Sequence, residues 1–342
     1  MSPSEPVKKL TRKDFTSDQD IRWCPGCGDY AILATMQRTL PTVGADPAKT
    51  VFLSGIGCSS RFPYYMNTYG FHSIHGRAPA FATGLKLTNP ELDIWVITGD
   101  GDGLSIGGNH LMHMLRRNVD VQMILFNNRI YGLTKGQYSP TSLVGLRSPS
   151  TPLGSIDMPV TPALLALGAG ARFVARSVDT MAKHLGPTFV EAREFRGTSF
   201  IEVLQNCPVF HDGAWDHVTD KARAGSTMLV LEHGKPMLFG DKGGPQQGLR
   251  LKPKTLELEV VTLGEDGITE DDVLIHDETN RPMAFLLGGL EPPNFPIALG
   301  VLLREQAPAY DASVVAQVES AKNKGMTDVD ALLRAGHTWT VE

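Results

Sequence analysis

The chain has 342 residues and a formal net charge of −5, and its longest apolar runs, such as VQMILF, are short. A chain of this length can form one large domain or two smaller ones around a sizeable core. The mild acidity argues against nucleic acid as a partner, and the short apolar runs argue against a membrane-spanning helix. The opening residues, MSPSEPVKKLTRKDF, lack the apolar stretch of a signal peptide, so we expect a cytoplasmic protein.

Helix-like and strand-like segments alternate between about residues 28 and 205. In chain order, the pattern predicts a helix over 29–40, a strand over 50–54, a helix over 78–87, a strand over 93–98, a helix over 106–117, a strand over 120–126, a helical stretch over 180–195 and a strand over 199–204. Continuous apolar strands that alternate with helices are typical of a parallel sheet covered on both faces. We therefore predict a doubly wound, mostly parallel α/β fold.

The pattern weakens after residue 208, where KGGPQQG and EDGITEDD indicate loops and only short isolated elements follow. We predict three parts: an N-terminal arm over 1–20, a cofactor-binding domain over 21–207, and an extension over 208–342 that packs on the core or on a partner subunit.

A polar or cysteine-bearing motif follows each predicted strand. GIGC follows the first strand, GDG the second, NN the third and QNC the fourth. In open α/β sheets, ligands bind beyond the carboxyl ends of the strands. The four motifs are therefore expected to meet at one edge of the sheet.

The GDG and NN motifs predict a site for a magnesium ion and a diphosphate. Asp100 stands at a strand end between two glycines, so backbone amides can approach an anion there. A carboxylate and a diphosphate repel unless a cation lies between them, and Mg²⁺ prefers hard oxygen ligands. Asn128 would add a side-chain oxygen and Ile130 a backbone carbonyl. The alternative is two unrelated turns, each with its own side-chain hydrogen bond.

The chain has four cysteines: the CxxC pair Cys24 and Cys27, and the single residues Cys58 and Cys207. A disulfide of the thioredoxin type would leave Cys58 and Cys207 unexplained. Zinc bound by four cysteines usually takes two close pairs, whereas an iron–sulfur cluster accepts irregular spacing if four thiolates converge. A cluster, a zinc site and buried or redox-active thiols remain the alternatives.

Six segments occur together in one order: WCPGCGDY, GIGCSSR, HGRAPAFATGLKLTNP, GDGDGLSIGGNHLMHMLRRN, NNRIYGLTKGQYSPTS and LQNC. This set resembles the β subunit of 2-oxoacid:ferredoxin oxidoreductases over about residues 20–250. GDG followed by NN also resembles the wider thiamine diphosphate motif. The resemblance implies the fold of a thiamine diphosphate-binding domain, with Mg²⁺ held by Asp100, Asn128 and Ile130. It also implies one [4Fe–4S] cluster on Cys24, Cys27, Cys58 and Cys207.

The same resemblance implies an activity and partners. The reaction would be the coenzyme A-linked oxidative decarboxylation of a 2-oxoacid, with electrons passed to ferredoxin. No motif in the chain supplies the glutamate that activates the thiamine ring, and the family places that residue on an α subunit. We therefore expect activity only in an αβ or (αβ)₂ assembly.

The motifs also give a set of expected cofactor contacts. His75 is the expected catalytic or diphosphate-contacting histidine, Arg77 is a weaker candidate, and His72, His110 and His113 are expected to be structural. The expected cofactor-binding residues are Ile56, Gly57, Cys58, Ser59, His75, Gly99, Asp100, Gly101, Asp102, Asn128, Ile130, Tyr131, Gly132, Leu133 and Thr134.

Lys135 bears on the substrate, because it lies just after the expected metal loop. Relatives that act on 2-oxoglutarate tend to carry a TKGQ-SPT run, which this chain has, and a cation there suits a second carboxylate. We therefore expect 2-oxoglutarate, which would yield succinyl-CoA. The alternatives are a pyruvate or broad 2-oxoacid enzyme, a cluster-free thiamine enzyme half and a non-catalytic iron–sulfur electron-transfer subunit. On residues alone, Lys135 could equally be a solvated lysine.

Overall fold

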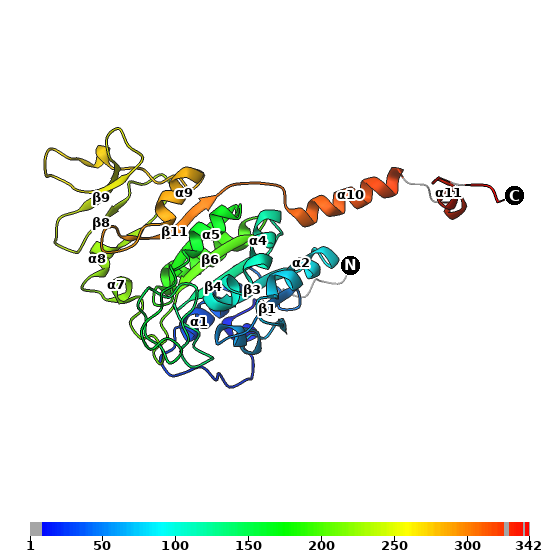
Figure 1. The fold of residues 1–342 in the computed structure, drawn as a ribbon, viewed down its shortest axis with the longest axis horizontal. Coiled ribbons are helices and arrows are strands. Elements are labelled where there is room, and N and C mark those ends of the chain that lie inside the picture. Colours follow the sequence, from blue (N-terminus) through cyan, green and yellow to red (C-terminus); the bar gives the residue numbers. More distant parts are fainter. Residues whose placement is uncertain (1–8, 325–327, 338, 342) are drawn as a thin grey trace.

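The computed structural model describes residues 9–324, 328–337 and 339–341, so the first eight residues of the expected N-terminal arm lie outside it. Within the described part, an eight-stranded sheet forms the centre of the molecule (Figure 1), in the order β2-β1-β3-β4-β6-β5-β11-β7. Its strands are β1 (Thr50–Ser54), β2 (Tyr69–His72), β3 (Asp93–Gly99), β4 (Gln122–Asn127), β5 (Phe173–Val178), β6 (Ser199–Leu204), β7 (Met228–Val230) and β11 (Ile297–Arg304).

The strands from β2 to β5 in this order run parallel, whereas β11 runs antiparallel to β5 and parallel to β7. The predicted mostly parallel α/β sheet is therefore confirmed. Two strands in this region, β2 and β5, were not predicted from the sequence. β2 is short and exposed, and β5 carries an arginine inside its apolar run, so neither has the continuous apolar pattern of a buried strand.

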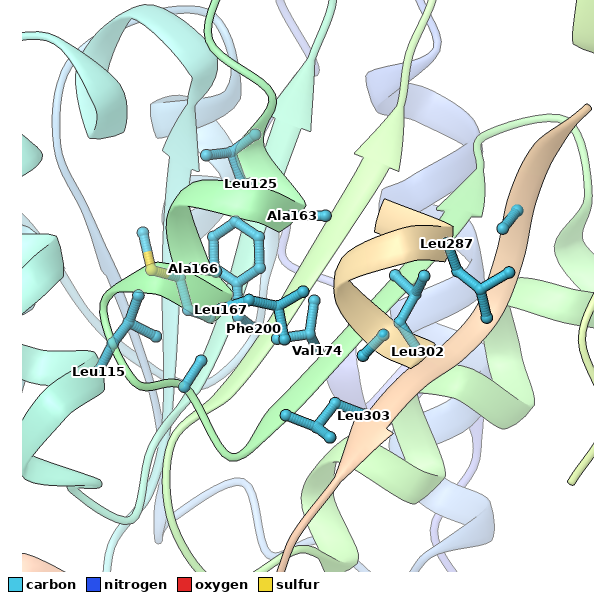
Figure 2. Close-up of a cluster of buried hydrophobic side chains, with 14 of the residues drawn as sticks. Leu115, Leu125, Ala163, Ala166, Leu167, Val174, Phe200, Leu287, Leu302 and Leu303 are labelled. Carbon is cyan, nitrogen blue, oxygen red and sulfur yellow. The ribbon is translucent and has the colours of Figure 1, made fainter. Parts of the chain in front are cut away.

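Helices cover both faces of the sheet. Successive strand residues point to opposite sides, so the apolar strands present two apolar faces that helices can bury. On one face, α1 (Asp29–Thr42) and α6 (Ala182–Glu194) pack against Phe52, Trp95 and Phe126. On the other face lie α2 (Ala78–Thr88), α4 (Gly108–Arg117), α5 (Pro162–Gly168) and α9 (Arg281–Gly288). Figure 2 shows part of this second layer, in which α5 contributes Ala166 and α9 contributes Leu287 to the buried cluster that includes Val174 and Phe200.

The segment after residue 207 contributes to the central sheet. It supplies β7 and β11, and it also forms a small antiparallel sheet of β8 (Leu238–Phe239), β9 (Gln247–Leu251) and β10 (Leu258–Thr262). Helix α10 (Tyr310–Lys324) then leaves the body of the molecule (Figure 1), followed by α11 (Val329–Arg334). The division of the chain at residue 207 stays a prediction, since β11 pairs directly with β5 of the expected cofactor domain.

Shorter elements complete the described chain. They are η1 (Arg12–Phe15), η2 (Ser59–Tyr65), α3 (Asp100–Leu104), α7 (Asp216–Thr219), α8 (Ala224–Thr227) and η3 (Glu270–Asp272). None of the helices in the described residues combines the length and the apolar character that crossing a membrane requires.

Candidate active site

The polar motifs meet at one edge of the sheet, as the sequence predicts. In the parallel register, Gly99 of β3 lies opposite Phe126 of β4, and Asn127 lies opposite Leu204 of β6. The next residues along each strand, Asp100, Asn128 and Gln205, therefore emerge from three neighbouring strand ends. The GIGC loop follows β1, the other neighbour of β3.

Asp100 is a buried carboxylate at the start of α3, with 2% of its surface exposed. Its Oδ2 accepts hydrogen bonds from Ser139 Oγ and Thr141 Oγ1, both at 2.6 Å. Burial raises the pKa of Asp100 to about 6, although these hydrogen bonds oppose the shift. A nearby cation would offset the cost of burying this charge, which is the environment expected of a metal ligand.

Asn128 connects the β4 loop to the cysteines. Its Oδ1 accepts a hydrogen bond from the Ile130 amide at 3.2 Å, and its Nδ2 donates to Gln205 Oε1 at 2.9 Å. Gln205 Nε2 in turn donates to Cys27 Sγ at 3.4 Å. The side chain of Asn128 thus holds a local turn, which is the alternative to a metal-binding role considered from the sequence. An amide oxygen has two lone pairs, so one remains for a metal ion.

Arg129 lies between the two expected metal ligands of this loop and has a left-handed backbone with φ 58°. Its guanidinium stacks on Trp215 at 3.9 Å and pairs with Glu291 at 3.3 Å. The indole nitrogen of Trp215 donates to the Asn127 carbonyl at 2.8 Å. The segment after Cys207 therefore holds the loop after β4 in place, the loop expected to bind the metal.

The two glycines of the GDG motif flank Asp100, and Gly101 permits a close contact with Tyr131. A Cβ atom on Gly101 would lie 2.1 Å from the Tyr131 ring, so a larger residue has no room there. The Tyr131 hydroxyl donates to the Gly101 carbonyl at 3.0 Å. This contact joins the GDG turn to the loop after β4.

Asp102 and His75 form a hydrogen-bonded pair beside this turn. His75 Nδ1 lies 2.5 Å from Asp102 Oδ1, and the same oxygen accepts the backbone amides of Ile56 and Gly76. The loop after β1 and the loop after β2 are thus tied to α3 through one carboxylate. Arg77 donates to the Ile106 carbonyl at 3.2 Å, a contact that suits a structural residue.

The loops that carry the four cysteines are joined by hydrogen bonds. Trp23 Nε1 donates to the Cys58 carbonyl at 2.6 Å, and the Gly28 amide donates to the Asn206 carbonyl at 3.2 Å. Gly132 lies close to two of the thiols, those of Cys207 and Cys58. A Cβ atom there would lie 3.5 Å from Cys207 Sγ and 3.7 Å from Cys58 Sγ.

All four cysteines are free thiols, and their sulfurs interact electrostatically. Burial, followed by the charge of Asp29, raises the pKa of Cys58 to about 12 and shifts the pKa of Cys27 upward as well. Cys207 and Cys58 contribute to the shift at Cys27, while Cys207 and Cys24 contribute to the shift at Cys58. A reactive redox thiol needs a lowered pKa, so Cys27 and Cys58 fit the alternative of buried thiols better than that of redox-active thiols.

The described residues contain no group of three or more histidine, cysteine, aspartate or glutamate side chains that could hold a metal ion. In a four-iron cluster each thiolate would bind a different iron, so the four sulfurs need not surround a single ion.

Lys135 lies in the exposed loop after β4, with φ 68°. No ion pair among the described residues involves it. Its ammonium is therefore available to an external anion.

The other expected contact residues lie around the same edge. Ser59 is buried at the start of η2, Gly57 has φ 133°, and Leu133 is exposed. Thr134 Oγ1 donates to the Tyr131 carbonyl at 3.3 Å. The ligand roles assigned to these residues, and to the magnesium and cluster ligands, stay predictions.

Four site residues had no role in the sequence-based prediction: Gln205, Ser139, Thr141 and Trp23. Each belongs to a segment that the resemblance included, namely LQNC, GQYSPTS and the residue before CPGC. Their partners lie on distant segments, so only the folded chain reveals their roles. Thr141 is an example, because its hydroxyl oxygen lies within hydrogen-bond distance of both Asp100 Oδ2, at 2.6 Å, and Asn127 Oδ1, at 3.0 Å.

The sheet with polar motifs at its strand ends agrees with the class of proteins that the comparison with known families indicates, the thiamine diphosphate enzymes. Residues 55–203 match the family described as "Thiamine pyrophosphate enzyme, C-terminal TPP binding domain". The match runs from the GIGC loop to β6 and includes the GDG and NN motifs.

Relatives narrow the class to a family. The chain is 49% identical to the 2-oxoglutarate oxidoreductase subunit KorB of Mycobacterium tuberculosis, over 96% of this chain and 88% of that protein. It is 47% identical to the β subunit of 2-oxoacid:ferredoxin oxidoreductase 1 of Aeropyrum pernix, over 56% of this chain and 60% of that protein. The chain therefore belongs to the family of 2-oxoacid:ferredoxin oxidoreductase β subunits, which confirms the resemblance.

A solved structure agrees with this assignment. A chain of the 2-oxoglutarate:ferredoxin oxidoreductase from Magnetococcus marinus, determined with 2-oxoglutarate, coenzyme A and succinyl-CoA bound, is similar with a TM-score of 0.75. The two chains are 32% identical, and the likeness covers 96% of each. The expected fold and enzyme class are thereby confirmed.

Proposed function

We propose that this chain is the cofactor-binding β subunit of a coenzyme A-dependent 2-oxoglutarate:ferredoxin oxidoreductase. The observation that carries the proposal is the direct link between the two expected cofactor sites. Asn128 of the metal loop and Cys27 of the cysteine set are bonded to the same side chain, Gln205. Electrons released at one site would have a short path to the other.

The residues at the strand ends fit magnesium and a diphosphate. Asp100 is a buried carboxylate, and the side-chain oxygen of Asn128 has a lone pair beyond the one that accepts the Ile130 amide. Bound there, thiamine diphosphate would supply the electron sink that decarboxylation of a 2-oxoacid requires. The chain itself holds the diphosphate, orients the ring and keeps the site dry.

The four cysteines fit a [4Fe–4S] cluster. The thiols of Cys27 and Cys58 are partly buried and burial raises their pKa values, so a bound cation would favour their thiolate forms. Cys58 follows Ile56 and Gly57, so one loop would contact both the diphosphate and the cluster. The cluster would accept the electrons and pass them to ferredoxin.

Lys135 supports 2-oxoglutarate as the substrate. Lys135 follows Ile130 by five residues in the same loop, and its ammonium forms no ion pair with the described residues, so it can pair with a second carboxylate. Substrates without that carboxylate, such as pyruvate, would gain nothing from this residue.

An α subunit would complete the site. Exposed apolar side chains crowd the loops beyond the strand ends, as expected of a surface that another chain covers. They include Ile74, Ile106, Leu133, Leu153, Met158 and Phe210. The partner would supply the glutamate that activates the thiamine ring, so the expected unit is αβ or (αβ)₂.

The test is to co-express the chain with its α subunit, purify the complex without oxygen, and follow reduction of a viologen dye. The proposal predicts reduction that requires both 2-oxoglutarate and coenzyme A and produces succinyl-CoA. Equal or faster reduction with pyruvate would point to a broad or pyruvate enzyme. Bound iron without thiamine diphosphate or any 2-oxoacid-dependent reduction would identify a non-catalytic electron-transfer subunit.

A further inference from the structure

Asp102 is a buried carboxylate that joins three segments of the site. It is 3% exposed and lies in α3, two residues after Asp100. Its Oδ1 lies 2.5 Å from His75 Nδ1 and accepts the Gly76 amide at 2.7 Å and the Ile56 amide at 3.0 Å. Its Oδ2 accepts the Thr98 hydroxyl at 2.6 Å.

These contacts leave Asp102 little capacity for a further ligand. A carboxylate has about four lone-pair sites on its two oxygens. Three donors already crowd Oδ1, and a Cβ atom on Gly55 would lie only 1.9 Å from Oδ2. The second aspartate of GDGDG is therefore placed to hold protein groups, whereas Asp100 is placed to meet a cation.

The same contacts fix the orientation of His75. With Nδ1 directed at Asp102, the other ring nitrogen, Nε2, must point away from the carboxylate. The ring of Tyr131 lies edge-on to the imidazole, with centroids 6.4 Å apart, and Tyr131 is itself tied to the Gly101 carbonyl. The His75 side chain remains 38% exposed, so an external ligand can reach it.

We propose that Asp102 is a positioning residue that keeps His75 in the Nδ1–H form and presents Nε2 to an oxygen anion of the cofactor or substrate. The positioning depends only on contacts within the chain, whereas the nature of the anion rests on the proposed function. That anion is either the diphosphate of the cofactor or the carboxylate of the 2-oxoacid. Without Asp102, the ring could rotate or change tautomer, and the anion would lose an oriented partner.

The first measurement needs no substitution. Selective ¹⁵N labelling of histidine in the full chain, with His75→Gln used to assign the signal, reports which ring nitrogen carries the proton. The proposal predicts a protonated Nδ1 that retains its proton in the absence of any ligand. A neutral His75 protonated at Nε2 would overturn the proposal whether or not the chain binds thiamine diphosphate.

The second measurement compares Asp102→Ala, Asp102→Asn and His75→Gln in the assembled complex. Asp102→Asn can keep the contacts, because its oxygen can face Ile56, Gly76 and His75 while the Thr98 hydroxyl accepts from its amide. We expect Asp102→Ala to raise one of two constants about tenfold or more: the Kd for thiamine diphosphate or the KM for the 2-oxoacid. Asp102→Asn should restore most of the loss. A raised Kd for thiamine diphosphate would identify the diphosphate, and a raised KM for the 2-oxoacid with little change in kcat would identify the carboxylate.

The double variant decides whether Asp102 acts through His75. If it does, adding Asp102→Ala to His75→Gln should change little the Kd or KM that the single variant Asp102→Ala raises. A full and independent effect of Asp102→Ala in the His75→Gln background would overturn the proposal. Thr98→Val is the matched control, because it removes a donor from the opposite oxygen and should leave both the His75 signal and that Kd or KM nearly unchanged. Failure of the unsubstituted complex to bind thiamine diphosphate would contradict the proposed function, while the ¹⁵N signal would still decide the positioning.

Discussion

At the scale of single residues, Asp100 is the charged group of the proposed magnesium site. The carboxylate is buried among the hydroxyls of Ser139 and Thr141, and burial raises its pKa to about 6. Replacing Asp100 with Ala should weaken thiamine diphosphate binding at least about tenfold, or about 1.4 kcal/mol, since it removes the proposed charged ligand of magnesium. Titration of the αβ complex with the cofactor in excess magnesium would measure this.

Asp93→Asn is the control for Asp100. It removes one negative charge from the first residue of β3, where Asp93 pairs with Arg193, far from the strand ends that form the site. Cofactor affinity should be unchanged in that variant. If Asp100→Ala also retained full affinity, the metal would have to bind elsewhere.

In the proposed function, substrate choice depends on Lys135. Lys135→Met keeps the length of the side chain and removes its charge, so the distal carboxylate of 2-oxoglutarate would lose its partner. A charged hydrogen bond is worth about 1.5–3 kcal/mol, so kcat/KM for 2-oxoglutarate should fall by roughly 10–10². Parallel dye-reduction assays with pyruvate should show a much smaller change. An equal fall for both substrates would assign Lys135 to the cofactor or the loop, and substrate choice to the α subunit.

At the scale of elements, a chain of buried polar contacts connects the metal loop to the C-terminal strand. Thr141 links Asp100 to Asn127, and Asn127 Nδ2 donates to Glu202 Oε1 at 2.8 Å. Glu202 pairs with Arg176 at 2.8 Å, and Arg176 also donates to the carbonyls of Ala298 and Gly288. The site therefore depends on β11 and α9 for its support.

Arg176→Met should destabilise the chain strongly, because Arg176 and Glu202 are both almost fully buried. Removing one partner of a buried ion pair costs about 3–5 kcal/mol, since the other charge is left uncompensated. Urea unfolding monitored by circular dichroism would measure the loss. Adding Glu202→Gln to the same chain should recover part of it. Arg250→Met, which breaks a half-exposed pair with Glu259, is the control and should cost less. Similar losses for Arg176→Met and Arg250→Met would contradict the account.

His276 holds the small C-terminal sheet to β11 and makes that contact sensitive to acid. It is 1% exposed, and its Nε2 contacts the Val301 carbonyl at 2.8 Å. Burial holds the pKa of His276 below its ordinary 6.5, despite partial compensation by that carbonyl and by Glu278 and Asp277. Near pH 6, His276 therefore binds a proton more readily in the unfolded chain than in the folded chain. As a result, the folded chain loses stability as the pH falls below about 6.5.

His276→Gln should reduce this sensitivity, because glutamine can still donate to the carbonyl but does not titrate. The difference in stability between pH 7.5 and pH 5.5 should shrink by up to about 1.4 kcal/mol. Thermal unfolding at the two values would show it, with His233→Gln in the same region as the exposed control. An unchanged pH dependence in His276→Gln would assign the acid sensitivity to other groups.

At the scale of the whole molecule, the sequence predicts best what is local and periodic. The apolar strands 50–54, 93–98 and 199–204 alternate with helices, and the structure contains them within one or two residues. The gathering of GIGC, GDG, NN and QNC follows from parallel strands alone. These features needed no knowledge of distant contacts.

The contribution of the C-terminal segment was harder to predict. β11 has the apolar sequence IALGVLLR, but its position beside β5 depends on a partner more than a hundred residues away. β5 was also hidden, because Arg176 interrupts its apolar run and is tolerated only through its pair with Glu202. Gln205 is similar, since its role requires Asn128 and Cys27 on other loops.

The central claim is that this chain couples thiamine chemistry to a [4Fe–4S] cluster on its own four cysteines. The most direct measurement is the electron paramagnetic resonance spectrum of the oxygen-free αβ complex, frozen after addition of 2-oxoglutarate and coenzyme A. The account predicts about four iron atoms per β chain and a reduced-cluster signal that appears only with substrate. Both should be lost when Cys58 is replaced with Ser. Full iron content and an unchanged signal in Cys58→Ser, or a complex that contains no iron, would contradict it.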